Sequence, residues 1–409
     1  MNSALLTIGN ELLSGATVNT NASYLGEQLF AAGFPVRESM VVRDDRKSIL
    51  RALDYLWESH RLIIITGGLG PTHDDVTLTA LSEFFDSPLE FHQPTYDALS
   101  DRLQSRDITL TERHREQAKL PRDATILPNP VGTAPALYFS GEGKHLFAMP
   151  GVPHEMRELL RERLLPEIEA LSGDVHVTRV LRTVGIPESD VYSRVKDLVG
   201  ELPEESVAFL PQAYGVDVRM VVPKEGNGVE MVEAVVEGMR SRLGNAVYTE
   251  IDESLAAVVG ALLRETGSTL AVAESCTGGL LADEVTNVPG SSDYFRAGYV
   301  TYSNRSKMQL LGVPEGLIRE YGAVSPQVAE AMVSGVLESS GADMALSTTG
   351  IAGPGGGTDE KPVGLVYIGC GVKDTVVSEK FQFTDERRLN KERSVAAALN
   401  LLRIQLLGG

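Results

Sequence analysis

The sequence has 409 residues, 43% of them hydrophobic, which exceeds what one hydrophobic core ordinarily supports and predicts two or three domains. A formal net charge of −19 disfavours direct binding of nucleic acid or of an anionic membrane, because the overall field repels phosphate groups. Two cysteines are too few for a disulfide framework, and we find no signal-peptide pattern and no apolar run that could span a membrane, so we expect a cytoplasmic protein.

The first domain is expected to cover residues 1–170, where short apolar runs alternate with amphipathic ones. Strands that alternate with helices at this spacing predict a parallel, doubly wound sheet. The pattern breaks at residues 171–174, where Leu-Ser-Gly-Asp marks a boundary. The elements expected in this domain are strands at 4–8, 35–42 and 62–66 and helices at 21–32 and 48–58.

A smaller module is expected over residues 171–250. Its predicted order of strand, helix, strand, strand and helix resembles a KH-type α+β domain. The phosphate-gripping Gly-X-X-Gly turn is missing, and residues 173–250 hold 13 acidic against 8 basic side chains. We therefore expect a spacer or dimerisation role without direct contact to nucleic acid. The expected elements are strands at 176–183, 207–210 and 216–222 and helices at 188–199 and 229–243.

A third domain is expected over residues 251–409, again α/β with three layers. The predicted fold class is therefore α/β, with two three-layer α/β domains joined by the small KH-like α+β module. The expected elements are strands at 269–273, 297–301, 344–348, 364–370 and 376–383 and helices at 254–266, 326–339 and 387–406.

The stretch 273–279, Ala-Glu-Ser-Cys-Thr-Gly-Gly, lies between a predicted strand and a helix. The start of a helix presents free amides that can stabilise an oxyanion or bind phosphate, and Gly278 and Gly279 let a ligand approach the backbone. Ser275 becomes a nucleophile here if a base accepts its proton. Tyr302 and Lys307 are both candidates for that base if their pKa values are lowered.

Two further features bear on this candidate site. Cys276 is an alternative nucleophile, but its side chain should point away from that of Ser275, and we interpret it as a packing residue. A second glycine-rich loop, residues 348–358, follows another buried strand and contains Gly350. Two such loops at strand carboxyl ends are expected to flank a single ligand crevice.

Residues 254–407 resemble the CinA C-terminal domain, the family of PncC-type nicotinamide mononucleotide amidohydrolases. The resemblance implies hydrolysis of the carboxamide to nicotinate mononucleotide and ammonia, without a cofactor. It implies Ser275 as nucleophile, with Tyr302 and Lys307 as base or orienting groups. By the same resemblance, the substrate is bound by Thr277, Gly278, Gly279, Ser292, Thr349, Gly350 and a phosphate-binding arginine, Arg387 as first choice and Arg393 as second. The matching stretches are 273–279, 288–292, 298–304, 322–325, 349–354 and 361–364.

A glycine-rich turn also follows the buried strand at 62–66. Gly67, Gly68 and Gly70 allow the backbone to cradle a phosphate. The adjacent Asp74 and Asp75 repel a bare phosphate, but they suit a hard cation such as Mg²⁺ that bridges carboxylate and phosphate. One of these two aspartates can alternatively cap the helix that follows.

Residues 1–170 resemble the MoaB/MogA-like molybdopterin-binding fold, specifically the CinA N-terminal domain. The resemblance implies metal-dependent hydrolysis of ADP-ribose to AMP and ribose 5-phosphate. The matched stretches make Glu11 a candidate metal ligand beside Asp74 and Asp75. They make Asn21, Asn129 and Gly132 candidate binding residues beside the glycines of the turn. The matching stretches are 8–15, 20–21, 66–75, 129–135 and 150–155.

The leading interpretation is a bifunctional pyridine-nucleotide salvage enzyme, with an amidase at the C-terminus and a pyrophosphatase at the N-terminus. A first alternative keeps the amidase and makes the N-terminal domain a nucleotide- or pterin-binding module. A second alternative is a competence- or DNA-damage-associated partner protein. The ligands implied are nicotinamide mononucleotide and ADP-ribose, and the family resemblance leads us to expect a homodimer.

Overall fold

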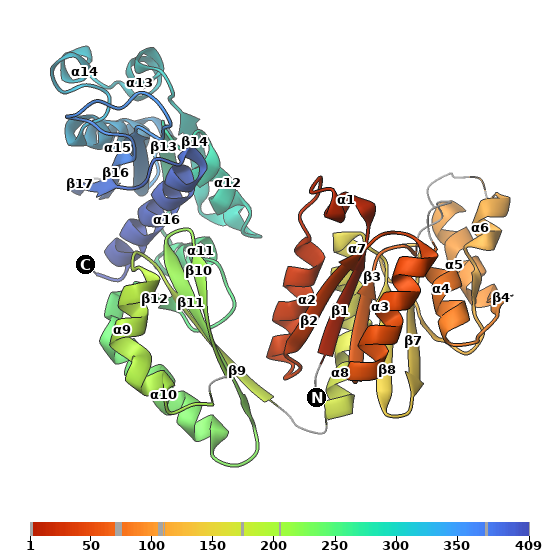
Figure 1. Ribbon diagram of the computed structural model, residues 1–409. Helices are drawn as coiled ribbons and strands as arrows, with labels where there is room; N and C mark the ends of the chain where they lie inside the picture. The colour runs from red at the N-terminus through yellow and green to blue at the C-terminus, as the bar shows by residue number, and fades with distance from the viewer. Residues whose placement is uncertain are drawn as a thin grey trace. The chain divides into compact units, whose positions relative to one another are not determined.

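The computed structural model describes residues 3–69, 76–104, 109, 111–172, 176–203, 206–372 and 375–408 (Figure 1). The chain forms two compact units, Met1–Thr178 with Val221–Val229 and Arg179–Met220 with Glu230–Gly409. No helix among the described residues is long and apolar enough to cross a membrane. The predicted mixture of helices and strands, with several separate sheets, is confirmed.

The first unit is built on a mixed sheet, with the described strands in the spatial order β2-β1-β3-β8-β7-β6. The four strands from β2 to β8 are parallel, whereas β7 and β6 run antiparallel to their neighbours. The prediction of a wholly parallel sheet was therefore wrong on one side. A tight turn at Glu142 and Gly143, with φ of 55° and 73°, joins β7 to β8, and such a short connection requires antiparallel strands. The strands are β1 (Ser3–Ile8), β2 (Val36–Val42), β3 (Leu62–Thr66), β6 (Thr125–Leu127), β7 (Ala136–Gly141) and β8 (Lys144–Met149).

Helices cover both faces of this sheet. Apolar residues of α3 and α4 pack on one face against Leu6 and Ile63, and those of α2, α7 and α8 pack on the other against Leu5 and Ile64. Alternating side chains of each buried strand thus serve two cores, as three layers require. The remaining elements of this part of the chain are α1 (Asn10–Leu13), α2 (Thr20–Ala31), α3 (Arg46–Ser59), α4 (Thr77–Phe84), α5 (Gln93–Gln104), α6 (Glu112–Glu116), α7 (Pro153–Leu159), the π-helix η1 (Leu160–Leu164), α8 (Leu165–Ser172) and the short strands β4 (Leu89–Phe91) and β5 (Lys119–Pro121).

The KH-like module has a sheet in the order β10-β11-β9-β12. The predicted order of strand, helix, strand, strand and helix is observed. The sequence analysis missed the short strand β12, which pairs with β9 through Val247 and Thr183. The elements are β9 (His176–Thr183), α9 (Glu188–Val199), β10 (Val207–Gln212), β11 (Gly215–Pro223), α10 (Gly228–Leu243), the 3₁₀ turn η3 (Gly244–Ala246) and β12 (Val247–Thr249).

The C-terminal sheet has the order β14-β13-β15-β16-β17, parallel from β14 to β15 and antiparallel beyond. Helices α11, α12 and α16 pack on one face of this sheet, and α15 packs on the other, which gives the expected three layers. The elements are α11 (Leu255–Thr266), β13 (Leu270–Glu274), α12 (Leu280–Thr286), η4 (Ser291–Asp293), β14 (Phe295–Val300), α13 (Asn304–Leu311), α14 (Glu315–Tyr321), α15 (Pro326–Ser340), β15 (Met344–Gly350), β16 (Leu365–Val372), β17 (Thr375–Gln382) and α16 (Arg387–Leu406).

Helix α16 also carries the contacts that hold the KH-like module against the C-terminal sheet. The Arg393 Nε donates to the Ala213 carbonyl at 2.8 Å, and the rings of Tyr214 and Phe383 meet edge to face at 5.6 Å. At the far end of the helix, Arg403 is buried and donates to the carbonyl oxygens of Val247 and Asn245. The two modules therefore share one packed boundary within the second unit.

Candidate functional site

Ser275 follows the buried interior strand β13 at its carboxyl end. Its main-chain N–H donates to the Thr348 carbonyl at 2.9 Å, which ties the start of the turn to the neighbouring strand β15. The turn then passes through Gly278 and Gly279, whose φ values of 62° and 98° favour glycine, and helix α12 begins at Leu280. The predicted strand, turn and helix around Ser275 are all observed.

Lys307 contacts the hydroxyl group of Ser275. Its Nζ lies 2.8 Å from the Ser275 Oγ and donates to the Thr301 carbonyl, also at 2.8 Å. Helix α13 positions the lysine, and the hydroxyls of Ser303 and Ser306 cap this helix reciprocally. The lysine side chain is 1% exposed, and it forms no ion pair among the residues the structure describes.

Burial lowers the pKa of Lys307 to about 8, because an ammonium group loses its hydration when it is enclosed. A lysine with a pKa of about 8 is partly neutral near neutral pH and can accept a proton. The arrangement of a hydroxyl beside an uncharged amine is the pairing that nucleophilic catalysis by serine requires.

The carboxylate of Glu274 is the partner of the amides that open helix α12. It is fully buried and accepts hydrogen bonds from the main-chain N–H groups of Gly279, Leu281 and Ala282 at 2.9, 3.0 and 2.8 Å. The expectation that this helix start presents free amides to an oxyanion is therefore wrong for these three groups, because a fixed anion already occupies them. The sequence analysis assigned Glu274 no role, although a carboxylate just before a glycine-rich helix start signals such a cap.

Cys276 lies in the apolar core rather than in the crevice. It is buried among residues of α11, α12 and α16, and burial raises the pKa of its thiol to about 11. A thiol in such surroundings stays protonated and is a poor nucleophile. This burial agrees with the interpretation of Cys276 as a packing residue.

Tyr302 lies at the surface, 60% exposed, and belongs to a different contact from that of Lys307. The Arg387 Nη2 donates to the Tyr302 hydroxyl at 2.9 Å, and the Arg387 Nη1 donates to the Gly353 carbonyl at 2.8 Å. Among the described residues no hydrogen bond joins Tyr302 to Ser275. The structure thus separates the two candidate bases: Lys307 contacts the serine, whereas Tyr302 contacts the arginine.

Two of the predicted binding threonines point their hydroxyls inward. The Thr277 Oγ1 lies 2.7 Å from the Thr348 Oγ1, and the Thr349 Oγ1 donates to the Ala323 carbonyl at 2.7 Å. Both side chains are buried, and these contacts occupy their hydroxyl groups. Ser292 is exposed on η4, and no hydrogen bond among the described residues links it to Ser275 or Lys307.

The second glycine-rich loop is held by a residue that the sequence analysis missed. Asn390 is fully buried, and its Nδ2 donates to the carbonyls of Ala352 and Thr384 at 3.0 and 2.8 Å. Its Oδ1 accepts from the main-chain N–H and the hydroxyl of Thr384. The sequence carries no signal of this role. One partner of Asn390, Ala352, is distant along the chain, and the other, Thr384, lies before the start of the helix.

In the first unit, Gly67 and Gly68 lie at the carboxyl end of β3. A Cβ on Gly67 would collide with the Ile8 carbonyl, and one on Gly68 with the Thr77 hydroxyl, and both have positive φ. Close packing of the backbone is therefore one reason for these glycines. Gly70, the third glycine predicted in this cradle, lies outside the described residues together with Asp74 and Asp75.

Asn21 supplies an oxygen atom without a partner at the same edge of the sheet. Its Nδ2 donates to the Gly151 carbonyl at 2.7 Å, whereas its Oδ1 is buried and accepts no hydrogen bond within the described part of the chain. Thr66, at the end of β3, likewise has a buried hydroxyl without a partner among these residues. Buried polar atoms are ordinarily satisfied, so such a pair indicates a place for a ligand, a water molecule or an ion.

Two residues near this edge carry oxygen atoms of the kind that a hard divalent cation binds. The carboxylate of Glu11 folds back over Gly9, where a Cβ would collide with it, and Asn21 offers its amide oxygen. Carboxylate and amide oxygens are the ligands that Mg²⁺ and similar ions prefer. No group of three or more His, Cys, Asp or Glu that could hold a metal occurs among the described residues.

Asn129 organises the loop that contains Gly132. Its Oδ1 accepts from the main-chain N–H groups of Val131 and Gly132 at 3.0 and 2.7 Å, and its Nδ2 donates to Ala134 and to the Glu155 carboxylate at 2.9 Å each. A Cβ on Gly132 would collide with the Glu155 carboxylate. These two residues therefore shape the loop.

Three family models together match nearly the whole chain. The model described as "CinA C-terminal domain" matches residues 252–406, "Probable molybdopterin binding domain" matches residues 4–170, and "Damage-inducible protein CinA KH domain" matches residues 178–249. Their order is the order of modules expected from the sequence.

Similar proteins include a CinA-like protein of Chloroherpeton thalassium, 40% identical over 412 residues, which cover 98% of each chain. A CinA-like protein of Kosmotoga olearia is 38% identical over 411 residues, covering 100% of this chain and 99% of that one. Among solved structures, competence/damage inducible protein CihA from Agrobacterium tumefaciens is 40% identical, covers 37% of this chain and 93% of its own, and has a TM-score of 0.37. The three domain matches, together with 40% identity over nearly the full length of a relative, show that this chain belongs to the CinA family.

Proposed function

We propose that the C-terminal domain is an amidohydrolase in which Ser275 is the nucleophile and Lys307 is the general base. The observation that carries the proposal is the 2.8 Å contact between the Ser275 Oγ and the Lys307 Nζ, made by a lysine that burial leaves partly neutral. The same contact favours Lys307 over Tyr302 as the base, because the Tyr302 hydroxyl is engaged by Arg387 instead.

The reaction then runs in two halves. The neutral Lys307 amine accepts the Ser275 hydroxyl proton while the Oγ attacks the carboxamide carbon, which forms a tetrahedral intermediate. As the carbon–nitrogen bond breaks, the ammonium form of Lys307 returns that proton to the leaving nitrogen, which departs as ammonia. A water molecule, deprotonated by the same amine, hydrolyses the ester and releases the carboxylate product and Ser275. This sequence requires no cofactor.

The developing oxyanion needs donors other than the amides that Glu274 occupies. The main-chain N–H groups of Thr277 and Gly278 have no hydrogen-bond partner among the described residues. They lie two and three residues after the nucleophile in the same turn, where preorganised donors can stabilise the transition state. We assign the oxyanion site to these two groups, with Glu274 holding the turn in place.

The substrate proposed is nicotinamide mononucleotide. It pairs a carboxamide, which the serine can attack, with a phosphate, which requires a cation. Arg387 is the proposed phosphate ligand, because it is exposed beside Tyr302 and the second glycine-rich loop, whereas Arg393 is half-buried and binds the Ala213 carbonyl of the KH-like module. The exposed Tyr302, held by Arg387, offers an aromatic face to the pyridine ring.

The test is release of ammonia from nicotinamide mononucleotide by the purified full-length chain. The Ser275→Ala variant should lose the activity, whereas Cys276→Ala should keep it, because Cys276 packs in the core. Full activity of Ser275→Ala would show that the nucleophile is another residue. Loss of activity in Cys276→Ala, with folding intact, would indicate that the Cys276 thiol is the nucleophile.

A second activity is proposed for the N-terminal domain, metal-dependent hydrolysis of ADP-ribose to AMP and ribose 5-phosphate. The observation that favours it is the buried, unpartnered Asn21 Oδ1 at the carboxyl edge of the sheet. A divalent cation there would be held by Glu11 and Asn21, together with Asp74 and Asp75, and would neutralise charge on the pyrophosphate. Gly67 and Gly68, at the carboxyl end of β3, are the proposed main-chain neighbours of the phosphate groups.

AMP formation from ADP-ribose should depend on added Mg²⁺ and should be lost in Glu11→Gln and Asp75→Asn. Production of AMP by both variants at the unchanged rate would overturn the assignment of these ligands. Failure to form AMP with any divalent cation would leave the domain as a nucleotide-binding module.

A further inference from the structure

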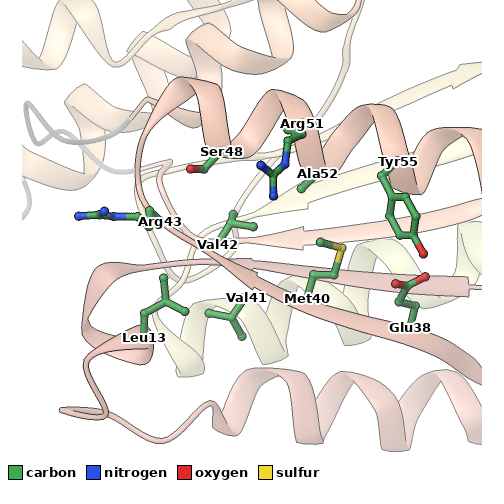
Figure 2. A pocket seen from close by; sticks show the side chains of 10 residues that line it. All are labelled: Leu13, Glu38, Met40, Val41, Val42, Arg43, Ser48, Arg51, Ala52 and Tyr55. Carbon is green, nitrogen blue, oxygen red and sulfur yellow. The ribbon is translucent and has the colours of Figure 1, made fainter.

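A cavity of about 570 Å³ opens between the outer strand β2 and helix α3 in the first unit (Figure 2). Met40 and Val42 of the strand and Ala52 of the helix form an apolar wall. Ligand pockets for small molecules fall in the same range of volumes and are lined in the same way, by apolar groups with a few polar ones. The cavity has no role in the functions discussed above.

Polar groups stand at distinct positions around this apolar wall. Figure 2 shows Tyr55 and Glu38 turned toward each other at one end of the cavity. Arg51 extends from helix α3 toward the strand, with Met40 on the opposite wall. Arg51 forms no hydrogen bond or ion pair within the described part of the chain. A guanidinium without an acidic partner stands out in a protein with 56 acidic side chains.

The other end of the cavity leads to the glycine-rich edge of the sheet. Leu13 lines the cavity and belongs to helix α1, which also carries Glu11. The carbonyl of Val42, another lining residue, accepts a hydrogen bond from the Gly9 N–H at 3.2 Å. The cavity therefore adjoins the segment that is proposed to bind the cation and the pyrophosphate.

We propose that this cavity binds the adenosine part of the nucleotide whose phosphates lie at the sheet edge. The base lies between the Arg51 guanidinium and the Met40 side chain, because guanidinium planes stack on bases. The carboxylate of Glu38 accepts a hydrogen bond from the exocyclic amino group of adenine. The proposal rests on the nucleotide-binding role proposed for the N-terminal domain and adds the residues that select the base.

The chemistry predicts a preference for adenine over hypoxanthine. Hypoxanthine carries a carbonyl oxygen in place of the amino group, and that oxygen faces the negative charge of Glu38. A site that hydrogen-bonds a substrate group rejects the analogue without it far more strongly than a purely apolar pocket does. Glu38→Gln removes the charge and supplies an amide that can donate to the carbonyl, so this variant should reduce the discrimination.

Binding of AMP and of IMP to the full-length chain is measured by isothermal titration calorimetry. The unaltered protein should bind AMP about tenfold or more tightly than IMP, and Glu38→Gln should narrow this ratio. Arg51→Ala should weaken the binding of both nucleotides by about tenfold through the loss of stacking. Lys47→Ala, which removes a charge from the same helix outside the cavity, should leave both affinities unchanged. Equal binding of AMP and IMP, or unchanged AMP binding by Arg51→Ala, would overturn the proposal.

Ribose 5-phosphate, which has no base, separates this proposal from that of hydrolysis. Its binding should be the same in Arg51→Ala as in the unaltered protein. If the variants change AMP binding as expected but ADP-ribose is not cleaved, the adenosine site stands and the pyrophosphatase proposal fails. If ADP-ribose is cleaved and Arg51→Ala leaves its KM unchanged, the pyrophosphatase proposal stands and the adenosine site fails. Arg51 is exposed, so its replacement should leave folding intact.

Discussion

The guanidinium of Arg387 donates a hydrogen bond to the hydroxyl of Tyr302, across 85 residues of sequence, at 2.9 Å. Two residues that the sequence suggests for separate tasks, phosphate binding and proton transfer, therefore form one unit. The Nη1 of the same guanidinium donates a hydrogen bond to the Gly353 carbonyl in the second glycine-rich loop. A phosphate that displaces or shares this arginine would at once affect the loop and the tyrosine.

Replacement of Arg387 should therefore act on substrate binding. We expect Arg387→Ala to raise the KM for nicotinamide mononucleotide about tenfold or more, since a charge-assisted hydrogen bond is lost. Arg388→Ala, the matched control on the next residue, should leave KM unchanged. Because Arg387 and Tyr302 are in contact, the effects of Arg387→Ala and Tyr302→Phe should be non-additive in a double-mutant cycle. Additive effects would mean that the two residues act independently.

The lowered pKa of Lys307 sets the pH dependence of the amidase. The base acts in its neutral form, so kcat/KM should rise with pH below about 8 and level off above it. In Lys307→Arg the guanidinium stays protonated, so the activity should fall by about 10²- to 10⁴-fold and the rise should vanish. A steady-state pH profile of both proteins checks this. A flat profile in the unaltered enzyme would contradict the role of Lys307.

The buried carboxylate of Glu274 should matter to both stability and rate. Glu274→Gln leaves an amide where three main-chain N–H groups converge, so at least one of them loses its acceptor. We expect a loss of about 1.5–3 kcal/mol in the free energy of unfolding, measured by urea denaturation. The kcat of the variant, measured at saturating substrate, should also fall, because the turn that carries Ser275 loses the carboxylate that holds it in place. An unchanged kcat in the folded variant would show that Glu274 only caps the helix and does not affect the reaction.

Arg393 should be separable from the chemistry. Arg393→Ala removes the hydrogen bond to the Ala213 carbonyl and should lower the melting temperature of the second unit. Its kcat and KM for nicotinamide mononucleotide should stay close to those of the unaltered protein, in contrast to Arg387→Ala. A large rise in KM would restore Arg393 as a phosphate ligand.

Much of the fold follows from local pattern. The buried strand β13, the turn after it and the helix α12 are evident because apolar runs and glycines mark them in sequence. The antiparallel side of the first sheet depends on the tight turn at Glu142 and Gly143, where Gly141-Glu-Gly-Lys144 is a local signal of a hairpin. Pairings between distant residues, such as that of Lys307 with Ser275, leave two candidate bases open until the chain is folded.

In the first unit, too, the sequence does not predict which side-chain atoms are available to a ligand. Asn129 matches a family motif, yet its hydrogen bonds go to main-chain atoms of the loop around it and to the Glu155 carboxylate of α7. A motif identifies the position, but which atoms remain available to a ligand depends on packing. The unpartnered oxygen of Asn21 is an example, because no local pattern distinguishes it from the many asparagines that begin helices.

The contact between helix α16 and the KH-like module has a practical consequence for anyone who wishes to isolate the amidase domain. A fragment that begins near residue 251 would keep Arg403 but lose the carbonyl groups of Asn245 and Val247 that accept its hydrogen bonds. It would also leave the ring of Phe383 without that of Tyr214. The newly exposed aromatic surface favours aggregation, whereas Arg403 keeps its hydrogen bonds to the Asn400 Oδ1. A soluble fragment would therefore call for a polar side chain in place of Phe383 or for retention of the module.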